Sequence, residues 1–116
     1  MRLPGWRLVS LPSEEVVGGA LEYLSSTDVQ YGQLMGAVKA SEHQGKVAKS
    51  VAFLSATGTV AEKESKAYTS QEYMHWLESH QNIVADLEVI RAKRKRAELT
   101  IDVWRSLNAS RRQGNI

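Results

Sequence analysis

The chain has no cysteine among its 116 residues. This absence excludes disulfide bonds, thiolate zinc sites and a cysteine nucleophile, and it gives no sign of an oxidising compartment. Proline occurs only twice, at Pro4 and Pro12. Because proline is the residue that most strongly interrupts a helix, nothing after Pro12 forbids helical structure. The long run without proline favours an all-α protein.

Long apolar runs are also lacking. No stretch approaches the roughly 20 apolar residues that a membrane-spanning helix needs. The first twelve residues begin with a positive charge, but Pro4, Arg7 and Pro12 interrupt any apolar segment, so they make a poor signal peptide. We therefore expect a cytoplasmic protein with no membrane contact.

Recognisable catalytic motifs are absent as well. The sequence has no phosphate-binding glycine loop, dinucleotide-binding pattern or nucleophile elbow. Glu72 and His75 form an ExxH pair, but di-iron helical bundles need a second such pair and two further carboxylates. We expect no enzyme activity, no metal, no cofactor and no small-molecule substrate. A metalloenzyme that uses Glu72, His75, Glu78 and His80 is a remote alternative.

Helix signals divide the first half of the chain into two predicted helices. Ser13 is a suitable N-cap, and acidic residues follow it in the first turn. The helix over about 14–25 should be short, because two glycines at 18–19 weaken it. Serine and threonine at 25–27 then offer new caps for a helix over about 28–55.

The second half contains a short helix and the longest one. Gly58 is a natural stop for the preceding helix, and Thr59 can cap a short helix over 60–68. Ser70, with acidic residues nearby, can cap a continuous helix over about 71–109.

Both long helices carry a seam of residues at alternating spacings of three and four, which is a heptad pattern. In the first long helix the seam is Tyr31, Leu34, Val38, Ser41, Gly45, Ala48 and Ala52, whose small later members allow a close approach. In the second it is Tyr73, Trp76, His80, Ile83, Leu87, Ile90, Arg94, Ala97, Ile101, Trp104 and Asn108. The polar residues at 80, 94 and 108 are typical of positions that set register or oligomer state.

The seams predict an all-α fold, a long antiparallel αα-hairpin resembling a coiled coil with one or two short extra helices. Residues 1–12 would form an N-terminal arm, residues 13–112 a single helical domain and residues 113–116 a disordered tail. A hairpin alone leaves apolar surface exposed, so we expect a homo-oligomer. The arm around Trp6 or a neighbouring subunit would cover an apolar arc, and the predicted interface residues are Leu99, Val103, Trp104 and Leu107.

Charge is distributed unevenly, although the net charge is only +2. Residues 91–112 hold eight basic and two acidic side chains, a local balance of +6, whereas residues 1–90 have a balance of −4. Such asymmetry suggests a surface for a polyanion or for an acidic face of another subunit. The predicted nucleic-acid contacts are Arg91, Lys93, Lys95, Arg96, Arg111 and Arg112. The alternative is a solvated or subunit-contacting basic face, with Arg94–Glu98 and Asp102–Arg105 as local surface pairs.

Two segments, FLSATGTVAEKESKAYTSQEY and IRAKRKRAELTIDVWRSLNASRR, resemble a family of small uncharacterised proteins encoded by temperate bacteriophages. The resemblance covers roughly residues 25–112 and lies in the patterns GTVAE-x-E-x-KAY-x-S and R-A-E-L-x-I-x-VWRSLNA. It implies a bacterial host cell and an accessory role in phage DNA metabolism, near recombination or replication. We therefore predict a non-enzymatic protein that binds DNA or a phage recombination or replication protein through its basic helix. The alternative is a helical protein–protein adaptor or assembly factor without nucleic-acid contact.

Overall fold

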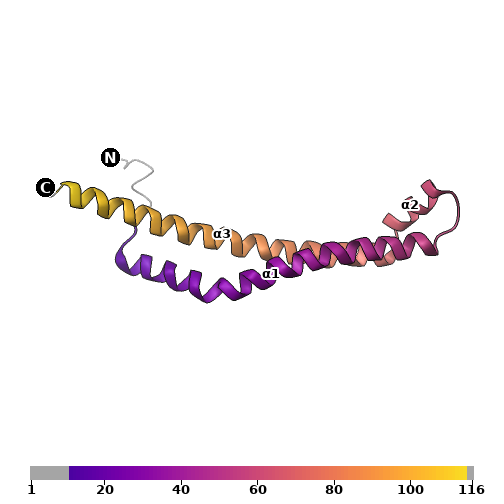
Figure 1. Ribbon diagram of the computed structural model, residues 1–116, viewed down its shortest axis with the longest axis horizontal. Coiled ribbons are helices and arrows are strands. Elements are labelled where there is room, and N and C mark those ends of the chain that lie inside the picture. Colours follow the sequence, from indigo (N-terminus) through magenta and orange to yellow (C-terminus); the bar gives the residue numbers. More distant parts are fainter. Residues whose placement is uncertain (1–10, 115–116) are drawn as a thin grey trace, which may run out of the picture. The chain divides into compact units, whose positions relative to one another are not determined.

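The computed structural model describes residues 11–114 of the chain. These residues form three helices and no strand: α1 (Glu14–Ser55), α2 (Val60–Tyr68) and α3 (Gln71–Gly114) (Figure 1). The prediction of an all-α protein is confirmed. Most of the expected N-terminal arm, residues 1–10, lies outside the described residues, and so do residues 115–116 of the expected tail.

Helix α1 begins where the sequence predicts, because the Ser13 hydroxyl accepts a hydrogen bond from the Val16 amide at 3.3 Å. The predicted break near residues 25–27 is wrong, since α1 continues through them. The Ser26 and Thr27 hydroxyls donate to the Tyr23 carbonyl, at 3.1 and 2.7 Å, instead of capping a new helix. Hydroxyls that bond back to the preceding turn are compatible with a continuous helix.

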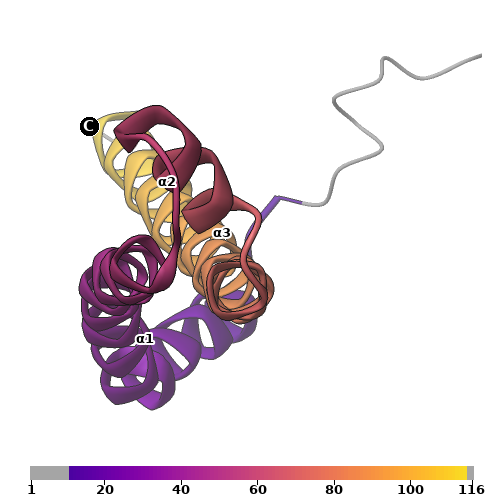
Figure 2. The same ribbon diagram turned by 90° about the vertical axis from the view of Figure 1, so that its right-hand side faces the viewer.

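Helix α2 matches its predicted bounds, and its ends show why. Gly58 has a positive φ of 116°, a conformation that other residues rarely adopt. The Thr59 hydroxyl then caps α2 by accepting from the Glu62 amide at 3.2 Å. Ala67, at the end of α2, is fully buried. This short helix connects the end of α1 to the start of α3 (Figure 2).

Helix α3 is continuous, as predicted. The Ser70 hydroxyl accepts from the Tyr73 amide at 3.2 Å and donates to the Ala67 carbonyl at 2.7 Å, so it joins the end of α2 to the start of α3. The helix extends to Gly114, past the predicted end near residue 109. Residues 113–114, expected in a disordered tail, are therefore helical.

The chain divides into two compact units. Unit 1 comprises Met1–Asp28 and Arg91–Ile116, and unit 2 comprises Val29–Ile90, so α1 and α3 contribute to both. The expectation of a single domain over 13–112 stays a prediction. In both units the predicted seam positions are buried or half-buried, Ile90 being buried and Ile101 half-buried. The seam of α1 also extends back, at the same spacing, through Thr27, Leu24, Ala20 and Val17.

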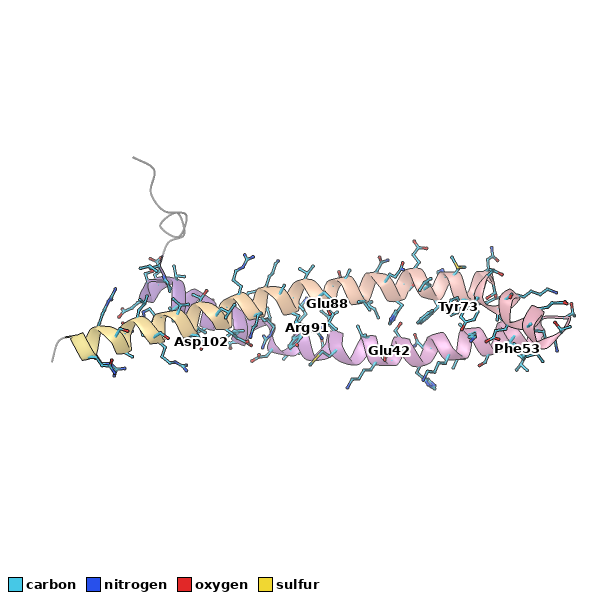
Figure 3. All side chains as sticks on the ribbon, turned by 90° about the horizontal axis from the view of Figure 1, so that it is seen from above. Glu42, Phe53, Tyr73, Glu88, Arg91 and Asp102 are labelled. Atoms are coloured by element: carbon cyan, nitrogen blue, oxygen red, sulfur yellow. The ribbon has the colours of Figure 1, made fainter. Side chains whose placement is uncertain are left out.

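Unit 2 has a row of aromatic rings beside a helix face of small residues. The rings of Tyr68, Tyr73, Trp76 and His80 follow one another with centroids 5.4, 5.3 and 4.8 Å apart. Tyr73 is labelled in Figure 3. A methyl group added to Gly45 would overlap the Trp76 indole. The predicted close approach at this seam is therefore made by an indole ring against a glycine.

Candidate nucleic-acid interface

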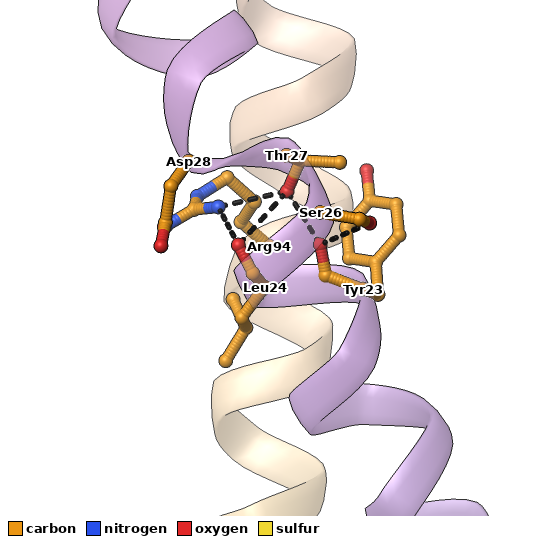
Figure 4. A network of polar contacts seen from close by, with 6 residues as sticks. All are labelled: Tyr23, Leu24, Ser26, Thr27, Asp28 and Arg94. Atoms are coloured by element: carbon orange, nitrogen blue, oxygen red, sulfur yellow. Dashed lines mark hydrogen bonds and ion pairs between the residues drawn. The ribbon is translucent and has the colours of Figure 1, made fainter.

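Arg94 is the basic residue of α3 that the fold itself uses. Its Nη1 donates to the Leu24 carbonyl and to the Thr27 hydroxyl, both at 2.8 Å. Its Nη2 donates to Asp28 Oδ1 at 2.7 Å (Figure 4). All these partners belong to α1 and, like Arg94, to unit 1. The local-pair hypothesis placed a partner at Glu98, on α3 itself; the structure shows Asp28 as an ion-pair partner from α1.

The burial of Arg94 explains why it needs several partners. Its side chain is 14% exposed, and a guanidinium withdrawn from water must find acceptors for its N–H groups. Thr27 is buried too, and its hydroxyl both donates to Tyr23 and accepts from Arg94. Asp28 is 64% exposed, so solvent screens much of its attraction to Arg94. Arg94 is therefore a structural anchor, in keeping with a polar seam residue that sets register.

The predicted contact residues are on the surface of unit 1. All six are exposed. Among the residues that the structure describes, five of them form no ion pair with an acidic side chain: Lys93, Lys95, Arg96, Arg111 and Arg112. A cation without an ion-pair partner is available to bind an anionic ligand.

The six residues do not form one patch. Arg111 follows Arg96 by 15 residues, roughly 22 Å along a helix. Around the axis, Lys93 and Arg96 are roughly 60° apart, whereas Lys95 lies roughly 160° from Lys93. The structure therefore brings together Lys93 and Arg96, and it separates them from Lys95 and from the last turn of α3.

A groove in unit 1 lies beside Lys93 and Arg96. It has a volume of about 380 Å³ and is called the Tyr23 groove below. It combines two cations with an aromatic ring and aliphatic side chains; its lining residues are Val16, Ala20, Tyr23, Lys93, Arg96, Ala97 and Thr100. The Thr100 hydroxyl donates to the Arg96 carbonyl at 2.9 Å, so it is occupied by its own helix.

A second groove continues along the same face of α3. This Leu99 groove, of about 340 Å³, shares three residues with the Tyr23 groove and is lined by Leu11, Pro12, Val16, Arg96, Leu99, Thr100 and Val103. Leu99 is 51% exposed and Val103 is 44% exposed, while Trp104 and Leu107 are half-buried. The apolar arc expected from the sequence is present, and its role as an oligomer interface stays a prediction.

Unit 2 contains a Ser–His pair that belongs to the interior. Ser41 Oγ and His80 Nδ1 are 2.9 Å apart, and the Trp76 indole N–H donates to the Ser41 carbonyl at 2.7 Å. Ser41 is only 7% exposed, and the half-buried His80 stacks on Trp76, so the pair belongs to the packing between α1 and α3 in unit 2. Like Arg94, His80 joins α3 to a polar group of α1, which is the behaviour of a register residue.

A further groove of unit 2, of about 580 Å³, is bordered by Lys49 and Glu64. The Lys49 ammonium donates to the Tyr68 hydroxyl at 2.6 Å and lies 3.6 Å from a Glu64 carboxylate oxygen. The hydrogen bond to Tyr68 is the main cause that raises the pKa of Lys49 above its ordinary value, with Glu64 adding to it. Because charges of both signs border this groove, it is a weaker candidate for a polyanion than the Tyr23 groove.

Two other kinds of site receive no support within residues 11–114. No three histidine or acidic side chains gather there as a metal site would require, and both Glu72 and His75 are exposed. No helix in this part of the chain is both long enough and apolar enough to cross a bilayer.

Comparison with known proteins identifies no relative. No protein-family model matches the chain, and neither a curated protein nor a solved structure matches it.

Sequence reasoning missed Tyr23, Leu24, Thr27 and Asp28. The sequence predicts Tyr23 and Leu24 at the end of a short first helix, Thr27 as a cap and Asp28 in the first turn of a second helix, and this division hides their position on the seam. The signal was present, because stepping back from Tyr31 by four and three residues reaches Thr27 and Leu24. The same extension places Tyr23 beside the seam and within reach of the basic segment of α3.

Proposed function

We propose that this protein is a non-enzymatic accessory protein that binds nucleic acid, or a nucleoprotein complex, through the basic C-terminal part of α3. One observation carries the proposal. The guanidinium of Arg94 is bonded to polar groups of α1. Five other basic residues of α3 are exposed and form no ion pair among the described residues: Lys93, Lys95, Arg96, Arg111 and Arg112. Exposed cations of this kind bind phosphates and release counterions.

We further propose that α1 and α3 form an antiparallel αα-hairpin that assembles into a homo-oligomer. In unit 2, Ser41 pairs with His80 and Gly45 lies against Trp76, so the numbers rise on one helix as they fall on the other. The exposed Leu99 and Val103 favour a subunit contact. Light scattering at tens of micromolar should report a mass above the 12.9 kDa of one chain. A 12.9 kDa particle would contradict the oligomer.

The biological setting is also a proposal. The GTVAE and VWRSLNA segments support an origin in a temperate bacteriophage, whose proteins act in the cytoplasm of a bacterial host. The basic part of α3 would then serve phage DNA metabolism, with DNA or a recombination or replication protein as its partner.

The test is a binding titration at several salt concentrations. Labelled DNA should bind the full chain with an affinity that falls steeply with salt, by a log–log slope of about −0.7 to −0.9 per phosphate contacted. The triple variant Lys93→Gln, Lys95→Gln, Arg96→Gln should weaken binding to all sequences and flatten this slope. Circular dichroism should show unchanged helix content.

A matched control removes the same charge from unit 2. The variant Lys39→Gln, Lys46→Gln, Lys63→Gln changes the net charge equally, outside the basic segment. It should leave most of the affinity in place. Equal losses from both triple variants would mean that net charge, and not this surface, attracts the DNA.

The alternative function is a protein–protein adaptor, and the Leu99 groove is the observation that favours it. Leu99 and Val103 expose apolar surface beside Arg96, which suits a partner helix with acidic flanks. In that case DNA binding would be weak and unaffected by the triple glutamine variant. The change Leu99→Ser, Val103→Ser would instead abolish oligomer or partner binding.

A further inference from the structure

We propose that the Tyr23 groove binds a single-stranded stretch of nucleic acid, with one base stacked on Tyr23 and phosphates at Lys93 and Arg96. The inference rests on the proposed function and specifies its substrate: single strands rather than duplex. Tyr23, a residue outside the basic segment, is then the residue that discriminates single strands from duplex.

The groove holds the groups that single-strand binding requires. Proteins that bind single strands combine cations, which follow the backbone, with aromatic rings on which bases stack. Here the ring is Tyr23 of α1, and the cations are Lys93 and Arg96, three residues apart on α3 and therefore neighbours on its surface. Aliphatic walls from Val16 and Ala20 are suited to the apolar face of a base.

The structure also fixes the position of Tyr23. Its carbonyl accepts hydrogen bonds from the Ser26 and Thr27 hydroxyls, and Thr27 in turn accepts from Arg94. The Tyr23 ring lies on the side of this network away from the Arg94 guanidinium (Figure 4). This partly buried network thus holds the backbone that carries the ring, while Tyr23 itself borders the groove.

The groove is better suited to a single strand than to the other two candidate occupants. In a duplex the base faces are already stacked, so Tyr23 would add nothing to the phosphate contacts. A second copy of this chain docking symmetrically through the same groove would place two copies of Lys93 and two of Arg96 in one interface. That juxtaposition of like charges opposes a dimer at this groove.

The test uses the full chain and three labelled oligonucleotides of equal length: a single strand, a duplex and a single strand with abasic sites in place of the bases. The abasic strand keeps the phosphates and removes the stacking. We expect the single strand to bind most tightly. Replacing Tyr23 by alanine should weaken its binding roughly 5- to 100-fold, the usual effect of losing one stacked base. Binding of the duplex and of the abasic strand should change less than twofold.

Further variants separate stacking from packing. Tyr23→Phe keeps the ring and should bind the single strand as the parent does, whereas Tyr23→Leu keeps apolar volume and should bind as weakly as the alanine variant. Tyr68→Ala removes an exposed tyrosine of unit 2 and should have no effect on binding. A 2-aminopurine base in the strand should be quenched by the parent protein and not by the leucine variant.

The outcomes distinguish this inference from the proposed function. If all three oligonucleotides bind equally and the Tyr23 variants match the parent, the single-strand inference is overturned while phosphate binding by α3 stands. If none of the three binds in a salt-dependent manner, both fail. If Tyr23→Ala lowers the oligomer mass and leaves DNA binding unchanged, the groove is a subunit contact.

Discussion

The two units contain the same heptad seam and fill it in different ways. In unit 2 the later seam residues of α1 are small, and Trp76 packs over Gly45. In unit 1 the corresponding contact is polar, because Arg94 reaches the Leu24 carbonyl and the Thr27 hydroxyl. Identical spacing therefore specifies which residues face inward, but not what kind of contact they make.

The difference has consequences at the surface. A ring that fills the space above a glycine contributes apolar contact and no net charge. The half-buried guanidinium of Arg94 instead bonds to polar groups of α1, including the carboxylate of Asp28, with which it forms an ion pair. The neighbouring cations, Lys93 and Arg96, have no ion-pair partner among the described residues. The polar contact in unit 1 thus favours a basic surface there.

The largest expected effect comes from shortening an isoleucine of the seam, which is more deeply buried in unit 2 than in unit 1. Ile90 of unit 2 is 6% exposed, so Ile90→Ala should lower the free energy of unfolding by about 2–5 kcal/mol. Ile101 of unit 1 is half-buried, so the same change there should cost less. Chemical denaturation measures both. The control is Val89→Ala, because Val89 is exposed. Equal losses of unfolding free energy at positions 90 and 101 would show that the two units do not differ in burial at the seam.

The next effect tests the polar anchor of unit 1. Replacing Arg94 by methionine removes every hydrogen bond of the guanidinium and should cost about 1.5–3 kcal/mol in stability. Lysine should not restore it, because an ammonium lacks the planar fork of donors. Asp28→Asn removes only an exposed partner and should cost at most about 1 kcal/mol. An Arg94→Met variant as stable as the parent would show that the anchor is dispensable.

A glycine substitution tests the close packing of unit 2. In Gly45→Ala the new methyl group overlaps the Trp76 ring, so stability should fall by about 1–2 kcal/mol after the gain in helix propensity is subtracted. At Gly36, in the same helix and unit, an added Cβ has no neighbour within 4 Å. Gly36→Ala should therefore raise stability by up to about 1 kcal/mol. The midpoint temperature of thermal unfolding should fall for Gly45→Ala and rise for Gly36→Ala. Shifts of the same sign would contradict the close packing of Trp76 on Gly45.

The smallest effect compares the two helix caps. Ser13 caps α1 in unit 1 and Thr59 caps α2 in unit 2, each through a hydrogen bond to a backbone amide. Each change to alanine should cost about 1 kcal/mol. Because α2 has only nine residues, Thr59→Ala should also raise amide hydrogen exchange throughout α2, whereas Ser13→Ala should affect only the first turn of α1. Thr57→Ala is the control, and exchange unchanged in α2 would argue against the cap.

The polar members of the seams show where prediction from sequence stopped. Spacing alone predicts that His80 and Arg94 are register residues, yet it does not identify their partners, Ser41 and the Thr27 region. A side chain's partner depends on which residues of the other helix lie opposite, and that requires the tertiary structure. The break predicted near residue 26 failed for a related reason, because serine and threonine can either cap a helix or bond back into it.

The candidate interface, too, could be predicted only in part from the sequence. The basic segment of α3 was evident from its charge, and the apolar arc with Leu99 and Val103 was evident from its spacing. The grooves were not, because each one needs side chains from α1 or the segment before it as well as from α3. Tyr23 acquires its proposed role only because folding places it beside Lys93 and Arg96.

The sequence by itself determined the all-α class, the caps at Ser13, Thr59 and Ser70, the stop at Gly58 and the inward face of each long helix. These features depend on residues within about one or two turns of each other, so local chemistry is sufficient to specify them. The tertiary structure alone decided that Arg94 is an anchor and that Lys93 and Arg96 border a groove beside Tyr23. Those outcomes join residues about 70 positions apart, whose meeting depends on how the two helices pack.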